Sequence, residues 1–276
     1  MLRITALMDN KPTEHRALLA EHGLSLYVEY NGRRILFDCG AGPNPLFNAH
    51  RLGIGLKDLD AVILSHSHYD HAAGFRDLTE KGLGSSRVYT GPRFFEPKYA
   101  RDGVRHTDLS AGFDQAFLKE HNIRHQQVDG LRELFCGAYL ISGFPRIHSF
   151  ERIPERFVRR TGSGFVRDDF CDEICMALDV DGGLAVLVGC SHPGILNMVC
   201  HVREVLGKPI KAVFGGTHLV EADGQRIEIT VERLKALGLE ILGLSHCSGD
   251  AADRVICVKS DIQGCHLGVG DSVFFD

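Results

Sequence analysis

Residues 61–71 read AVILSHSHYDH, an apolar run that ends in three histidines and an aspartate. The apolar part is typical of a buried strand. Residues two apart at a strand end point to the same side, so His66 and His68 can bind one metal ion, and the following turn presents Asp70 and His71 to a second. A lone histidine is more often a solvated or capping residue, but this grouping is dense for a chain with 15 histidines in 276 residues. The segment therefore predicts two adjacent metal sites.

The same order of elements occurs twice along the chain. Residues 24–37 are typical of a hairpin around Asn31-Gly32, a dipeptide that favours the type I′ turn, and residues 174–188 repeat the pattern. A helix-like segment and then an apolar strand follow each hairpin, with the strands at residues 61–64 and 212–214. The repetition predicts an α/β fold of two pseudo-symmetric halves, in which two sheets pack face to face with helices outside.

The remaining periodicity is weaker. It predicts helices at residues 193–206 and 229–237. Residues 76–170 combine many glycines, arginines and aromatic residues with little periodicity, which indicates an inserted loop and helix region. We expect residues 1–276 to form a single domain that carries this insertion.

Composition and charge limit the classes of partner. The chain is 44% hydrophobic and 24% charged, as in soluble globular proteins, and its net charge of -5 argues against a nucleic-acid or anionic membrane partner. No apolar run approaches the roughly 18 residues of a spanning helix, and the first residues lack a signal pattern. Nine cysteines without paired spacing favour a reducing compartment. We expect a cytoplasmic protein with a small-molecule partner, and a homo-oligomer is left open.

The pattern formed by His66, His68, Asp70 and His71 resembles the H-x-H-x-D-H signature of the metallo-beta-lactamase superfamily, and the order of hairpins resembles that superfamily as well. The resemblance implies a four-layered alpha/beta/beta/alpha sandwich with a dinuclear metal site at one edge. Carried over residue by residue, it implies one metal held by His66, His68 and His192 and a second held by Asp70, His71 and His246. We expect two divalent metal ions, with zinc as the preferred metal and manganese or iron as alternatives.

One segment departs from the superfamily pattern. Many members carry a bridging aspartate, and some a cysteine, before the last ligand, where this chain reads Phe214-Gly215-Gly216-Thr217-His218. Either the metals share only solvent, or His218 enters the site as a ligand, a hydrogen-bond donor or a proton-transfer group. We predict catalytic roles for Asp70 and His218, with His218 also contacting substrate.

Further segments, among them Glu21–Ser25, Gly143–Arg146 and the Gly-Gly-Thr-His-Leu run, resemble one branch of the superfamily. That branch is often labelled 7,8-dihydropterin-6-yl-methyl-4-(beta-D-ribofuranosyl)-aminobenzene-5'-phosphate synthase. The resemblance carries over the branch and not the substrate, because nothing in the sequence identifies a pterin pocket.

An arginine-rich segment bears on the substrate. Guanidinium groups suit phosphate oxygens, so this segment favours a phosphorylated substrate, with Arg146 as a binding residue. Nearby acidic residues allow the alternative of a solvated, salt-bridged surface. The arginines are Arg146, Arg152, Arg156, Arg159, Arg160 and Arg167, and the acidic residues are Glu151, Glu155, Asp168 and Asp169. We expect Asp172 and Glu173 to orient a metal-bound histidine, and Asp38 to support the floor of the site.

Three hypotheses of function follow. The first is a dinuclear hydrolase in which a metal-bound hydroxide attacks a small, phosphorylated ester, with Asp70 orienting the hydroxide and His218 assisting the leaving group. The second is a synthase that uses a dihydropterin diphosphate and releases pyrophosphate. The third is a di-iron redox protein or a metal-binding module without turnover, because a fold does not dictate its function.

Overall fold

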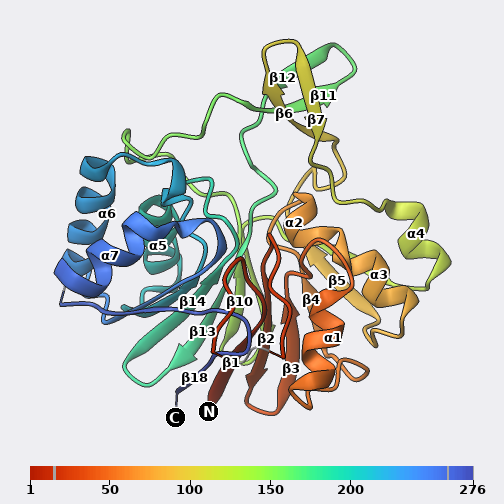
Figure 1. The fold of residues 1–276 in the computed structure, drawn as a ribbon, viewed down its shortest axis with the longest axis horizontal. Helices are drawn as coiled ribbons and strands as arrows, with labels where there is room; N and C mark the ends of the chain where they lie inside the picture. The colour runs from red at the N-terminus through yellow and green to blue at the C-terminus, as the bar shows by residue number, and fades with distance from the viewer. Residues whose placement is uncertain (15–16, 260, 276) are drawn as a thin grey trace.

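The computed structural model describes residues 1–14, 17–259 and 261–275, and the Cys257 side chain lies outside this description. Two seven-stranded sheets pack face to face (Figure 1). The first has the order β18 (Ser272–Phe275), β1 (Leu2–Met8), β2 (Ser25–Tyr30), β3 (Arg33–Phe37), β4 (Ala61–Ile63), β5 (Arg87–Thr90), β8 (Arg124–Gln127). The second has the order β17 (Gln263–His266), β16 (Ile241–Leu244), β15 (Ile210–Gly215), β14 (Gly183–Val188), β13 (Cys175–Val180), β10 (Ala138–Ile141), β9 (Leu131–Phe135).

The two sheets share one pairing pattern. In the first, the pairs from β18 to β3 are antiparallel and the pairs from β3 to β8 are parallel. In the second, the pairs from β9 to β14 are antiparallel and the pairs from β14 to β17 are parallel. In each sheet the pairing therefore changes from antiparallel to parallel after a hairpin, β2–β3 or β13–β14. This confirms the two pseudo-symmetric halves predicted from the sequence.

The first hairpin shows how the sequence sets this geometry. Asn31 and Gly32 both have positive φ, 48° and 79°, as a type I′ turn requires. This turn matches the right-handed twist of the flanking strands and fixes their register, with Tyr30 opposite Arg33.

Helices cover the outer face of each sheet, so the molecule has four layers (Figure 1). Strand β14 shows why. Val186 and Val188 pack outward with the helices, whereas Ala185 and Leu187 pack inward between the sheets. Each fully buried valine or leucine contributes about 1.5–3 kcal/mol to stability. The helices are α1 (Asn44–Arg51), α2 (Tyr69–Ala72), α3 (Gly74–Glu80) and α4 (Gln115–Glu120) on the first sheet, and α5 (Ile195–Leu206), α6 (Gly224–Ala236) and α7 (Asp250–Lys259) on the second.

Two helix boundaries differ in how well the sequence predicts them. Helix α5 ends at Gly207, whose φ of 64° is the left-handed geometry that ends many helices. Helix α6 begins five residues before the predicted start at residue 229, because the Asp223 carboxylate caps it by accepting a hydrogen bond from the Arg226 amide. Among the described residues, no helix combines the length and apolar character needed to cross a bilayer.

The region 76–170 corrects the expectation of loops and helices, because it is rich in strands. A third sheet has four strands in the order β12 (Gly164–Arg167), β11 (Phe157–Thr161), β6 (Lys98–Asp102), β7 (Arg105–Asp108). It stands apart from the sandwich at the top of Figure 1. Its strands are short, and β7 and β12 are largely exposed. They therefore lack the apolar alternation by which a half-buried strand is predicted.

Candidate metal centre

The candidate ligands gather at the carboxyl ends of parallel strands from both sheets. The segment His66–His71 follows β4 and runs into α2. His192, His218 and His246 lie in the loops after β14, β15 and β16, four, three and two residues beyond the ends of these strands. The pairing of two similar sheets brings these ends together at one edge of the sandwich (Figure 1).

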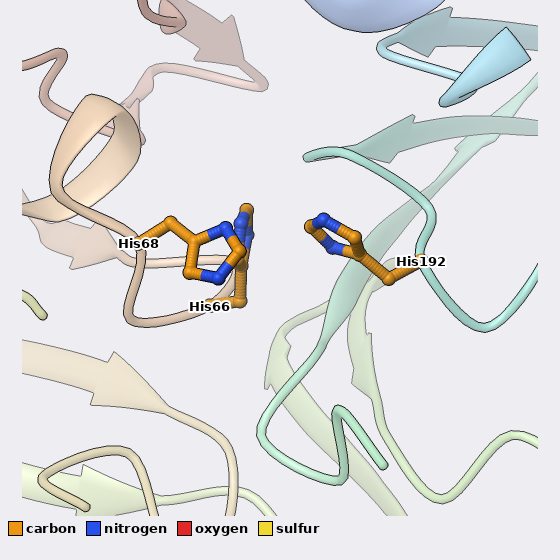
Figure 2. A group of neighbouring side chains, drawn as sticks. All are labelled: His66, His68 and His192. Atoms are coloured by element: carbon orange, nitrogen blue, oxygen red, sulfur yellow. The ribbon is translucent and has the colours of Figure 1, made fainter. Parts of the chain in front are cut away.

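The first group of side chains is His66, His68 and His192. Their ligand atoms lie within 4.8 Å of one another, and Figure 2 shows His192 reaching toward the other two rings from the opposite side. The Nε2 atoms of His66 and His68 are buried and have no hydrogen-bond partner among the described residues. Burial lowers the pKa of all three imidazoles well below the usual value, so they are neutral near pH 7.

These properties fit a metal ion. An unpaired buried polar atom costs about 1–3 kcal/mol, whereas a neutral imidazole nitrogen is a common ligand of zinc and iron. The chain also fixes which nitrogen faces the centre. The Ser65 hydroxyl donates to Asp38, so it accepts from His66 Nδ1 at 2.9 Å, and His66 Nε2 carries the lone pair.

The second group is His22, Asp70 and His246. Asp70 Oδ2 lies 2.9 Å from His22 Nε2 and 3.2 Å from His246 Nε2. Burial raises the pKa of the Asp70 carboxyl, but hydrogen bonds from His22 and His246 more than offset this and hold it well below its usual range. His246 Nδ1 contacts Asn10 Oδ1 at 2.8 Å. An ionised carboxylate between two imidazoles is a donor set that suits a divalent cation.

His71 lies between the two groups. Its Nδ1 atom donates to Asp38 Oδ2 over 2.6 Å, and its Nε2 atom lies 3.1 Å from Cys190 Sγ. Its ring centroid is 4.2 Å from that of His66 and 4.8 Å from that of His246. The structure therefore brings together all six side chains that the resemblance implied as metal ligands.

Carboxylates behind the histidines hold them in place. Glu173 accepts from His192 Nδ1 at 2.9 Å and from the backbone amides of Ser191 and His192. Asp172 accepts from the Ser67 amide, and its other oxygen pairs with buried Lys98 at 2.5 Å. These contacts are those expected of residues that orient a metal-bound histidine.

His218 also reaches the centre. Its ring centroid lies 4.6 Å from that of His192, and neither of its ring nitrogens has a hydrogen-bond partner in the part of the chain that the structure describes. His218 has a φ of 49°, and four other non-glycine residues in or beside the centre share this left-handed conformation. They are Asp38, Phe170, Ser191 and His246. Each costs about 1–2 kcal/mol, and such residues cluster at functional sites.

A cavity of about 250 Å³ opens onto both groups. His68, His192 and His218 line one part of it, and Asp70 and His246 line another. Its other lining residues are Asn10, His22, Tyr69, Leu109, Arg156, Phe157, Cys190, Val220, Glu221 and Cys247.

Arg156 and Arg146 line different cavities. Arg156 lines the cavity at the metal centre, where its guanidinium pairs with Glu221 and lies 4.1 Å from the centroid of the Phe157 ring. Arg146 lines a separate cavity with Arg152, and its Nη2 atom donates to the Asp169 carbonyl at 2.6 Å. The structure thus brings Arg156 to the centre and leaves Arg146, the arginine chosen from the sequence, outside it.

Three further residues at the centre were not proposed from the sequence as site residues. His22 precedes β2, and its only local signal is the Glu21-His22-Gly23 motif. Cys190 and Cys247 adjoin the ligand segments, and both are buried free thiols. Their places beside His192 and His246 were the available signal.

The sequence comparisons assign this fold and site to a family. Residues 19–135 match the sequence profile of the Metallo-beta-lactamase superfamily. The chain belongs to this superfamily, which confirms the resemblance seen in the sequence and the four-layered fold.

Relatives similar over the full length narrow the branch. The chain is 31% identical to 7,8-dihydropterin-6-methyl-4-(beta-D-ribofuranosyl)-aminobenzene-5'-phosphate synthase of Methanocaldococcus jannaschii, over 97% of this chain and 95% of the relative. The crystal structure of Tm1679, a metal-dependent hydrolase of the beta-lactamase superfamily, has a TM-score of 0.81 and 29% identity, with both chains covered completely. A diphosphatase of the PhnP family, with a TM-score of 0.52 and 18% identity over 100% of this chain and 98% of that one, shares the fold.

Proposed function

We propose that the protein is a metal-dependent hydrolase of a small phosphorylated ester. It would use two divalent metal ions, and zinc is the metal we favour. His66, His68 and His192 would hold one ion. Asp70, His71 and His246 would hold the other, with His22 beside Asp70. When bound, two such ions would lower the pKa of a water molecule and stabilise negative charge on the reacting group. The observation that carries this proposal is that both groups open onto one cavity with Arg156 at its wall.

The chain's own residues prepare the centre for this chemistry. Asp38 and Glu173 accept the Nδ1 protons of His71 and His192, so the Nε2 atoms of these rings are left to bind metal. Asp70 is held ionised by its two imidazole partners. His218 has no hydrogen-bond partner for either ring nitrogen among the described residues, and its Nε2 atom lies 3.7 Å from Glu221 Oε1, so it can donate a hydrogen bond to substrate or move a proton to a leaving oxygen.

Arg156 supports a phosphorylated substrate. Its guanidinium can form paired hydrogen bonds with phosphate oxygens, and the Phe157 ring holds it at the cavity wall. The cavity volume of about 250 Å³ is at the small end of the range for ligand sites, which favours a small substrate or one phosphorylated end of it.

The test is turnover of model esters by protein loaded separately with zinc, manganese or iron. We expect release of the leaving group from a nitrophenyl phosphodiester or phosphomonoester, lost on chelation and restored by adding metal. Protein carrying His68→Ala is the matched control, because it lacks one ligand of the proposed first ion. Failure of all three metal forms on both ester types would contradict the hydrolase proposal.

The full-length similarity to a synthase favours a second candidate, synthesis from a dihydropterin diphosphate and an aminobenzene ribotide. Here Arg156 would bind the diphosphate as it leaves, and metal ions held by the six proposed ligands would supply charge stabilisation. Pyrophosphate release that requires both substrates would support the synthase. Release of phosphate from a single ester in water would support the hydrolase.

A further inference from the structure

A cysteine sulfur lies between the two proposed metal sites. Cys190 Sγ forms a group with His66 and His71, in which the three ligand atoms lie within 4.8 Å of one another. His66 belongs to the proposed first site and His71 to the second. Cys190 is a free thiol, only 3% exposed, and it lines the cavity of the metal centre.

The neighbouring imidazoles present lone pairs to the same space. His71 Nδ1 donates to Asp38, so His71 Nε2 carries a lone pair toward the Cys190 sulfur, 3.1 Å away. His66 Nε2 is fully buried and has no partner among the described residues. A sulfur and a nitrogen bound to one tetrahedral zinc ion are about 3.6 Å apart, given bonds of about 2.3 and 2.0–2.1 Å. A shift of about half an ångström would therefore let both atoms bind one ion.

The Cys247 sulfur and the Gly189 carbonyl occupy space that a side chain at Gly216, just after β15, would need. A Cβ atom at Gly216 would lie 2.6 Å from Cys247 Sγ and 2.6 Å from the Gly189 carbonyl oxygen. The segment Gly215–His218, where a bridging carboxylate was expected, has none. Cys247 Sγ donates to the Cys190 carbonyl at 3.6 Å, so the two cysteine segments pack against each other there.

We propose that Cys190 supplies a thiolate ligand shared by the two metal sites, in place of the missing bridging carboxylate. This inference rests on the proposed two-metal function. Metal binding would replace the thiol proton by a metal–sulfur bond and release that proton to solvent. A soft thiolate beside imidazoles favours zinc or iron over magnesium or manganese.

X-ray absorption of the zinc protein and the optical spectrum of the cobalt(II) protein test the proposal, both on the full chain without a histidine tag. We expect sulfur in the zinc shell at about 2.3 Å and a near-ultraviolet sulfur-to-cobalt charge-transfer band. Both signals should be lost in Cys190→Ser. They should persist in Cys247→Ser and in Cys136→Ser, which changes an exposed cysteine outside the centre.

The outcomes separate this inference from the proposed function. A wild-type protein with two metals but only nitrogen and oxygen ligands would overturn the Cys190 assignment and leave the hydrolase proposal standing. Signals that disappear in Cys247→Ser and persist in Cys190→Ser would also overturn it. A wild-type protein that binds no metal would overturn both proposals. If Cys190→Ser fails to fold, the wild-type spectra decide whether sulfur binds metal, and loss of the sulfur signal in Cys247→Ser would overturn the Cys190 assignment.

Discussion

The two halves of the molecule provide the candidate metal ligands in different ways. In the first half, four candidate ligands occupy the six residues His66–His71, after a single strand. In the second half, His192, His218 and His246 follow three separate strands. The strand pairing is the same in both halves, so the difference lies in the loops. The comparison teaches that one half of the centre is encoded as a local motif and the other by topology.

The supporting carboxylates differ as well. Asp38 follows β3 within its own half and holds both Ser65 and His71. Glu173 lies two residues before the start of β13 and reaches the loop after β14. The first half therefore orients its ligands from a neighbouring parallel strand, whereas the second orients His192 from the antiparallel part of its sheet.

The strongest test breaks one ligand in each half. His68→Ala and His192→Ala should each reduce turnover to background and remove at least one metal ion per chain, because both histidines belong to the same buried group. Metal analysis and ester hydrolysis check this, with circular dichroism as the control for folding. Retention of activity by either variant would show that the halves do not share one centre.

Changing the supporting carboxylates should have a smaller effect. Asp38→Asn and Glu173→Gln should each weaken metal affinity about 10–100-fold, because they disturb histidines that remain in place. We expect the larger loss for Asp38→Asn, since Asp38 also holds the Ser65 amide and hydroxyl. Competition with a chelator measures the affinities. Unchanged affinity in both variants would mean that these carboxylates serve packing alone.

Variants of Arg156 and Arg146 test which of these arginines binds the substrate, because the two line different cavities. Arg156→Ala should raise KM about tenfold with little change in kcat, because it removes a charged hydrogen bond to substrate worth about 1.5 kcal/mol or more. Arg146→Ala is the matched control and should leave KM within about twofold, since Arg146 lines another cavity. Steady-state kinetics with a phosphorylated ester tests both, and the reverse order would restore Arg146 as the binding residue.

The last prediction concerns stability rather than turnover, and it involves Glu151. The Glu151 carboxylate accepts hydrogen bonds from the Leu196 and Asn197 amides in α5, beside the His192 loop. Burial raises the pKa of Glu151 to about 7, against those hydrogen bonds. The folded state thus holds this proton more tightly than the unfolded state. The resulting stability is full below pH 4.5 and is lost as pH rises through 7.

Glu151→Gln removes this titration. Between pH 4.5 and 7, the free energy of unfolding should therefore fall by on the order of 1–3 kcal/mol more in the wild type than in the variant. Urea unfolding at several pH values gives the two profiles. Parallel profiles would sink the assignment of this pH dependence to Glu151.

The sequence predicted the parts of the fold and centre that depend on local pattern. The Asn31-Gly32 turn, the alternating strands of both hairpins and the His66–His71 run all act through near neighbours in the chain. His192 and His246 became candidates once the superfamily pattern was matched. Their convergence with the first-half ligands depends on the packing of the two sheets against each other, which brings His66 and His192 together across 126 positions of sequence.

The rest depended on features that carry little local signal. His22 meets Asp70 across 48 positions, and a single histidine before a strand looks like many surface histidines. Cys190 resembles a small core residue until its neighbours are known. Arg156 could not be separated from the other arginines, because the strands of the third sheet lack apolar alternation.

The third sheet has a consequence for how this scaffold can diversify. Its strand β11 begins at Phe157, which lines the cavity next to Arg156, while the proposed ligands all lie on the sandwich. The cavity residues Arg156 and Phe157 and the proposed metal ligands thus lie in separate stretches of the sequence. Exchange of the two stretches that form this small sheet, residues 98–108 and 157–167, together with Arg156, could change the molecule on which the protein acts and leave its inorganic chemistry intact.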